Sequence, residues 1–129
     1  MNLKFTANQV TQTFDDGIHT LGFMDDSKEP QTYFLLQLGT EFDEQDKKLG
    51  QDTYYVEVVD EDQVSGYGGV KSVHVSFSKI LFEFEETATW RDDLTSVCIN
   101  YQITDKNFDV LKKTLQDIFF ATPEILTID

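Results

Sequence analysis

The chain has 129 residues, which is enough for one domain with its own core and too few for two. Hydrophobic residues make up 40% of the sequence and aromatic residues 13%, so the chain is globular rather than disordered. The formal net charge of −14 disfavours nucleic acid and anionic membranes as partners, because both repel an acidic surface. A basic protein is the complementary partner.

Two further features concern where the protein acts. The longest apolar runs hold about four residues, far short of the ~20 that a membrane helix needs. The first residues lack the apolar core of a signal peptide, and the single cysteine, Cys98, cannot form an internal disulfide. We therefore expect a cytoplasmic protein with no membrane association.

Strand patterns dominate the first part of the chain. Leu3 to Val10 and Ile18 to Met24 flank the turn signal Asp15-Asp16-Gly17, which predicts a hairpin between them. Polar residues over 25–31 predict a loop. Tyr33 to Leu38 is apolar on both parities, which predicts a central strand covered on both faces.

The segment from Thr40 to Gln51 has Phe42 and Leu49 as its only strong apolar anchors and Gly50 as a stop signal. We expect a loop or one to two turns of helix there.

Two β-rich runs follow, Thr53 to Val59 and Val70 to Phe77. The connection between them contains three glycines, which permit positive φ and predict a tight turn or bulge with Tyr67 at its crest. These structural glycines are Gly66, Gly68 and Gly69. The simplest interpretation is a hairpin connection.

The last third of the chain has two more strand patterns, followed by a segment in which the apolar residues have helical spacing. Lys79 to Glu86 and Thr95 to Ile103 alternate as strands, whereas Asp105 to Phe120 repeats its apolar residues every three to four positions. Thr104 or Asp105 is placed to cap this helix. We therefore predict a single α+β domain over residues 1–129: a mostly antiparallel sheet of about six or seven strands with a C-terminal α-helix packed on one face. The apolar stripe of that helix is Phe108, Leu111, Leu115, Ile118 and Phe119.

Acidic residues gather in one stretch. Glu41 to Asp62 holds nine acids against Lys47 and Lys48, a net charge of −7, which is half of the total. By itself such a run is typical of a solvated surface.

One combination of motifs resembles a known family. Along the chain stand Tyr33-Phe34-Leu35-Leu36-Gln37-Leu38, Glu41-Phe42-Asp43-Glu44-Gln45-Asp46, Leu49-Gly50, Tyr54-Tyr55 and Ser65-Gly66-Tyr67-Gly68-Gly69-Val70. Their order and spacing resemble the immunity protein 10 family of bacterial polymorphic toxin systems. The family pattern has a basic residue after the Leu-Leu-Gln segment and a glycine before the aromatic pair, where this chain has Leu38 and Thr53.

The resemblance implies a small non-enzymatic protein that protects its producer by binding a cognate toxin domain. It brings no catalytic residues to this chain. The acidity favours a basic toxin, and a nuclease fits best because a groove that binds phosphate is electropositive. The residues that we expect at the interface are Asp43, Glu44, Asp46, Tyr55, Asp60, Glu61, Asp62 and Tyr67.

Two other functions remain open at this level. Glu83 and Glu85 would share a strand face about 6.6 Å apart, the spacing of an inverting glycosidase but also of a solvated face. A small carboxylate-dependent hydrolase is therefore one alternative. A regulatory or oligomerisation module that uses a sheet edge is the other.

Cofactor and metal sites are not indicated. The glycine-rich stretch fits no phosphate-binding template. His19, His74 and Cys98 could together ligate zinc but lack paired spacing, so two strand histidines and a buried thiol are the simpler interpretation. Trp90 is interpreted as a cap over the edge of the core.

Overall fold

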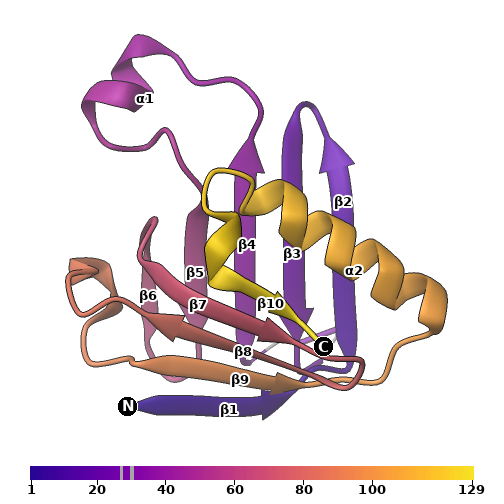
Figure 1. Ribbon diagram of the computed structural model, residues 1–129. Coiled ribbons are helices and arrows are strands. Elements are labelled where there is room, and N and C mark those ends of the chain that lie inside the picture. Colours follow the sequence, from indigo (N-terminus) through magenta and orange to yellow (C-terminus); the bar gives the residue numbers. More distant parts are fainter. Residues whose placement is uncertain (27, 30) are drawn as a thin grey trace.

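The computed structural model describes residues 1–26, 28–29 and 31–129. Within these residues the chain forms ten strands in two five-stranded sheets, together with one long helix near its C-terminus (Figure 1). The predicted α+β class is confirmed, but six or seven strands were too few. No helix of the described residues is long and apolar enough to cross a membrane.

Sheet A has the spatial order β1-β9-β8-β7-β10, and sheet B has the order β2-β3-β4-β5-β6. Sheet A comprises β1 (Asn2–Thr6), β7 (Val70–Val75), β8 (Lys79–Phe84), β9 (Ser96–Asn100) and β10 (Leu126–Ile128). Sheet B comprises β2 (Gln9–Asp15), β3 (Ile18–Met24), β4 (Tyr33–Gly39), β5 (Tyr55–Val59) and β6 (Gln63–Tyr67). The helical elements are α1 (Glu44–Lys48), η1 (Thr89–Arg91), α2 (Asp105–Ile118) and η2 (Pro123–Ile125). Sheet B is antiparallel throughout, whereas β1 runs parallel to β9 and β10 parallel to β7.

The core lies between sheet B and a layer made of sheet A and α2. The strands of the two sheets cross steeply, and α2 lies beside sheet A over the same side of sheet B (Figure 1). The rings of Phe34 in β4 and Phe82 in β8 stack across the sheets with centroids 4.3 Å apart. Both side chains are fully buried.

The opposite face of sheet B, which we call the outer face, is not covered by another layer of the described chain. In β4 the buried side chains are those of Phe34, Leu36 and Leu38, and the alternate residues are only half-buried. The prediction that both faces of this strand are covered is therefore wrong. Leu35 is instead shielded locally, because its side chain leans across Gly22 of β3.

The predicted first strand, Leu3 to Val10, is two strands in different sheets. The chain crosses from β1 to β2 at Ala7 and Asn8, whose backbone N–H groups donate to Asn100 and Met24, both at 2.8 Å. Ordinary strand alternation continues through the crossing, so the pattern did not reveal it. The predicted hairpin to Ile18–Met24 is confirmed for β2 and β3.

The glycine-rich stretch is not the hairpin turn that we predicted. The hairpin partner of β5 is β6, which the prediction missed, and their turn is Asp60-Glu61-Asp62. Gly68 and Gly69, with φ of 70° and 89°, carry the chain from sheet B to sheet A. Tyr67 is the last residue of β6 rather than the crest of a turn.

Gly66 serves packing rather than a positive φ. A Cβ atom at this position would lie 2.3 Å from Cγ of Trp90. The indole of Trp90 packs there, donates to the carbonyl of Gly68 at 3.2 Å and meets the ring of Phe84 at 5.3 Å. The interpretation of Trp90 as a cap over the core edge is confirmed.

The other elements follow their patterns closely. Thr104 caps α2, since its hydroxyl accepts from the N–H of Asn107 at 3.1 Å. A short helix, α1, forms within the segment 40–51 as expected, although Leu49 is 59% exposed and anchors nothing in the core. The three-residue β10 was not predicted. The predicted loop over 25–31 includes positions 27 and 30, which lie outside the described residues.

The attachment of α2 can be tested at Leu115, which is fully buried. Leu115→Ala should lower the free energy of unfolding by ~2–5 kcal/mol, because it leaves a cavity under the helix. Val110→Ala is the matched control, since Val110 is 41% exposed on the same helix. Urea denaturation measures both, and equal effects of the two changes would contradict a buried role for Leu115.

Gly66 offers a second test of the packing. Gly66→Ala should destabilise the protein by ~1–3 kcal/mol, because the new methyl group overlaps the Trp90 indole. The loss should shrink strongly in a Trp90→Ala background, so a double-mutant cycle of unfolding free energies measures the clash. Gly39→Ala is the control, because a Cβ there meets only ordinary contacts of 3.7 Å and longer. If Gly66→Ala destabilised the Trp90→Ala protein as much as the wild type, the clash with the indole would be excluded as the cause.

Candidate functional site

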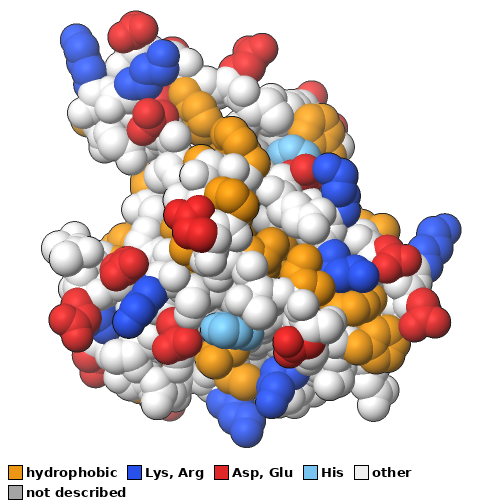
Figure 2. Space-filling view, in the orientation of Figure 1, with side chains coloured by type: hydrophobic (Ala, Val, Ile, Leu, Met, Phe, Trp, Pro, Cys, Tyr) orange, Lys and Arg blue, Asp and Glu red, His pale blue; other side chains and the backbone are white. Residues whose placement is uncertain are grey.

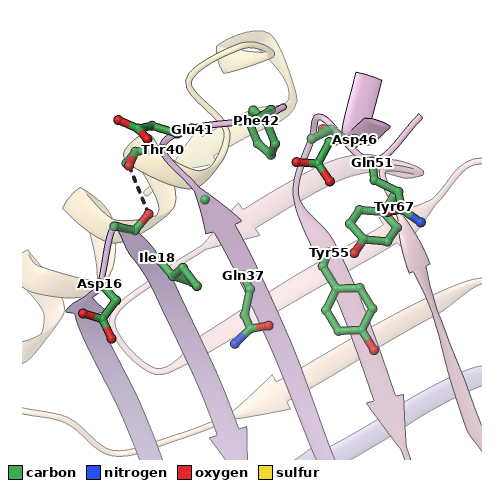
Figure 3. Close-up of a pocket in the computed structure, with 13 residues that line it drawn as sticks. Asp16, Ile18, Gln37, Thr40, Glu41, Phe42, Asp46, Gln51, Tyr55 and Tyr67 are labelled. Carbon is green, nitrogen blue, oxygen red and sulfur yellow. Dashed lines mark hydrogen bonds between the residues drawn. The ribbon is translucent and has the colours of Figure 1, made fainter. Parts of the chain in front are cut away.

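A groove of about 920 Å³ lies at one end of the outer face, beneath the segment that carries α1 (Figure 3). One wall is the β2–β3 turn, the other is the segment that follows β4, and the floor is formed by side chains of β4, β5 and β6. The lining residues of the turn and β3 are Asp16, Gly17 and Ile18; those of β4 and the following segment are Gln37, Gly39, Thr40, Glu41, Phe42, Asp46, Gln51 and Thr53; Tyr55 and Tyr67 complete the floor.

The wall that carries α1 is held by polar contacts, because α1 itself has no buried residue. Asp43 and Asp46 form a reciprocal capping box: each side chain accepts from the backbone N–H of the other, at 2.8 and 3.1 Å. Thr40 joins the two walls, donating to the carbonyl of Gly17 from its N–H at 2.9 Å and its hydroxyl at 3.1 Å (Figure 3). Phe42 packs against the core.

The groove combines negative charge with aromatic surface. Asp16, Glu41 and Asp46 supply carboxylates, and no lysine, arginine or histidine is among the described residues that line it. The rings of Tyr55 and Tyr67 lie side by side on the floor, with centroids 5.4 Å apart (Figure 3). Carboxylates bind a cation by charge and aromatic faces bind it through their quadrupole. The groove therefore suits a cationic side chain.

Beyond the groove, a network of hydrogen bonds fixes the middle of the outer face. The carboxylate of Glu57 in β5 accepts from the hydroxyls of Tyr33 at 2.5 Å and Tyr55 at 2.8 Å, and from the amide of Gln63 at 3.2 Å. The bond to Glu57, with burial and the Glu57 charge, raises the pKa of Tyr33 to about 12. Burial raises the pKa of Tyr55 as well. Both phenols stay protonated donors at neutral pH, so their positions are held.

The predicted interface residues fall into two groups. Asp46, Tyr55 and Tyr67 line the groove together. The capping residue Asp43 and its neighbour Glu44 stand at the start of α1.

The second group is the turn Asp60-Glu61-Asp62, which lies at the far end of β5 from Tyr55 and begins five residues, or ~17 Å, away. The acidic stretch is thus not one continuous patch, and its acids mark both ends of the outer face. The structural glycines join this face to sheet A and make room for Trp90.

Sequence reasoning missed Tyr33 and Glu57, as well as Asp16 on the other wall. A signal existed, because Tyr33, Gln37, Tyr55 and Glu57 all have the parity of the outer face. It becomes readable only once β4 and β5 are paired, with Gln37 opposite Tyr55.

The paired glutamates do not share a strand face. Glu83 accepts from the Ser72 hydroxyl at 3.0 Å within the β7–β8 pair. Glu85 lies beyond the end of β8, where its N–H donates to the carbonyl of Gly69. Neither lines the groove, so their arrangement does not favour the hydrolase alternative.

The zinc candidates are also apart. His19 lies in sheet B with its ring 4.3 Å from that of Phe14. His74 and Cys98 are in sheet A, on either side of Leu81 in the strand register. Cys98 is half-buried rather than buried.

Comparison with known proteins links this architecture to one family. The sequence model of the family described as Immunity protein 10 matches residues 6–109, which include sheet B, α1 and every residue of the groove. No curated protein and no solved structure matches the chain.

The Glu57 network predicts a specific alkaline titration. The pKa of Tyr33 lies above its ordinary value of 10.0, so its contribution to stability is complete below pH 10 and is lost as the pH rises toward 12. Glu57→Gln removes the charged acceptor and should return the pKa of Tyr33 toward the ordinary value, with less alkaline loss of stability. Carbon NMR of labelled tyrosines resolves the individual rings. Glu83→Gln is the control, and a Tyr33 titration that is equal in both variants would contradict the network.

Proposed function

The chain belongs to the immunity protein 10 family, and from this premise we propose that it neutralises a cognate toxin domain by binding and occluding it. An immunity protein implies a toxin as its partner, and immunity proteins are generally not enzymes. The observation that carries the proposal is the family match over residues 6–109, which spans the groove and the strands beside it. Protection then requires tight binding, in the nanomolar range or beyond, or about −12 kcal/mol.

The charge of the chain supports a basic toxin. A protein of net charge −14, with carboxylates at Asp16, Glu41 and Asp46 around an aromatic floor, attracts cationic surfaces at long range. Domains that bind nucleic acid carry such surfaces, because they must neutralise phosphate. We therefore propose a nuclease as the toxin class and the cytoplasm of the producing cell as the place of action.

We expect the gene beside this one to encode the toxin domain, and co-expression with that domain is the deciding experiment. Host cells that express the toxin domain alone should die, and those that also express this chain should survive. The purified proteins should form a complex of fixed stoichiometry. Failure of the folded, soluble chain to rescue the host or to form the complex would refute neutralisation of that toxin.

Electrostatic steering gives a quantitative prediction at Glu41, which is exposed and lies outside α1. Glu41→Lys should slow association about threefold or more at low salt, while dissociation changes less. The difference should fade as salt rises, because screening shortens to ~8 Å at physiological ionic strength. Stopped-flow measurements over a salt series record both rates.

The control for this prediction is Glu124→Lys, an equal charge reversal at an exposed residue of η2, which packs on sheet A. Asp43 and Asp46 are unsuitable for such a test, because reversing either would break the cap of α1. Equal slowing by the two reversals would indicate that only net charge matters and that the groove does not guide the encounter.

A further inference from the structure

We propose that the toxin domain docks on the outer face of sheet B, with the tyrosines of this face at the centre of the contact and a basic, arginine-bearing surface on the toxin. This inference rests on the proposed function, because it names the surface through which neutralisation occurs. The face includes the groove and continues from it along β4, β5 and β6 to the turn at Asp60-Glu61-Asp62.

The sequence of sheet B supports a cationic occupant. None of its five strands contains a lysine or an arginine, although the chain has ten such residues. Its only histidine, His19, pairs with Leu38 on the core side of the sheet. The outer face therefore carries carboxylates at both ends and in the middle without a basic residue on its strands. A second copy of this chain would set acid against acid, so the face is complementary to a different, basic protein.

The opposite side of the molecule differs in charge. Strands β1, β7 and β8 of sheet A carry Lys4, Lys71 and Lys79. On α2, Lys112 pairs with Asp109 at 3.2 Å and Lys113 with Asp117 at 2.7 Å. Figure 2 shows this side, where acidic and basic side chains are interspersed. A mixed surface of this kind does not select a cationic partner.

The outer face is built for tight contact, from the groove to the hydrogen-bond network of Glu57. Across the strands, Gln37, Tyr55 and Tyr67 form one row of opposed residues. Because Glu57 already holds Tyr33 and Tyr55 by hydrogen bonds, these rings lose little freedom when a partner binds. Tyr67 is 42% exposed at the end of the edge strand, so it has surface left to bury. Tyrosines of this kind are frequent binding hot spots.

The face is also large enough. Five strands span ~19 Å across, and the seven-residue strands β3 and β4 run ~20 Å along it. The flat area is therefore ~400 Å², and projecting side chains and the α1 wall increase the accessible area toward the ~800 Å² that each partner buries in a standard interface. An arginine of the toxin that enters the groove would stack on Tyr55 or Tyr67 and meet the carboxylate of Asp46.

A pair of matched variants tests the proposal with the toxin domain encoded beside this gene as the probe. Ser65 is an exposed residue of the edge strand β6, opposite Glu57 on the outer face. Ser65→Arg adds bulk and positive charge to the outer face beside Glu57 and should weaken binding about a hundredfold. Thr127 is an exposed residue of the edge strand β10 in sheet A, and Thr127→Arg should leave the affinity within about threefold.

Calorimetric titration measures affinity, and thermal unfolding checks that each variant is folded. Tyr67→Ala should speed dissociation, while Phe120→Ala, which removes a 67% exposed aromatic ring just after α2, should not. If Ser65→Arg does not fold, Ser65→Lys replaces it and should weaken binding in the same way. Suppose that the wild-type protein binds the toxin domain. If Thr127→Arg weakens this binding more than Ser65→Arg, or if neither change weakens it, the proposed docking face is wrong and the proposed function stands. If wild type does not bind the toxin domain, both fall.

Discussion

Sheet A and α2 pack on the same side of sheet B, and the character of the outer face follows from this one-sided burial. In a sheet with one covered face, alternate residues point to the core and to the solvent side, and β4 and β5 follow this alternation at every residue. The buried set, including Phe34 and Val56, supplies the core. The alternate set, including Tyr33 and Tyr55, is not part of the core, so these side chains are available to contact the proposed toxin. In the proposed complex, core packing and toxin binding therefore use opposite faces of the same strands.

The two crossings between the sheets make this arrangement possible. At the first, Ala7 and Asn8 pass the chain from β1 to β2; at the second, Gly68 and Gly69 return it to β7. The second crossing stands beside the groove, where Gly66 admits the Trp90 indole against the core side of β6. Trp90 thereby supports the strand that ends in Tyr67. The glycine-rich motif is structural in origin, yet it positions an aromatic side chain of the proposed contact surface.

How far the sequence could be read depended on the range of each interaction. Local signals succeeded, as in the α2 stripe around Leu115 and the β2–β3 turn, because neighbours in sequence determine them. The prediction of which sheet each strand joins failed, because the apolar alternation from Leu3 to Val10 is the same whether or not the chain changes sheets. The site divided in the same way. Charge and motif order indicated Asp46 and Tyr67, whereas Glu57 acquires its role only through cross-strand neighbours that no local pattern reveals.

In the proposed complex, the outer face separates the two tasks of a neutralising protein in space. Long-range attraction needs charge but not fixed geometry, and the acids at its ends, such as Glu41 and Asp62, are exposed. Long residence needs fixed geometry and desolvated area, and the tyrosines tied to Glu57 stand between those ends. Placing Glu57 at the centre costs little, because its carboxylate is satisfied by two phenols and an amide. It thereby adds negative potential at the centre of the face while its oxygens remain hydrogen-bonded, so charge complementarity and preorganisation come from the same side chain.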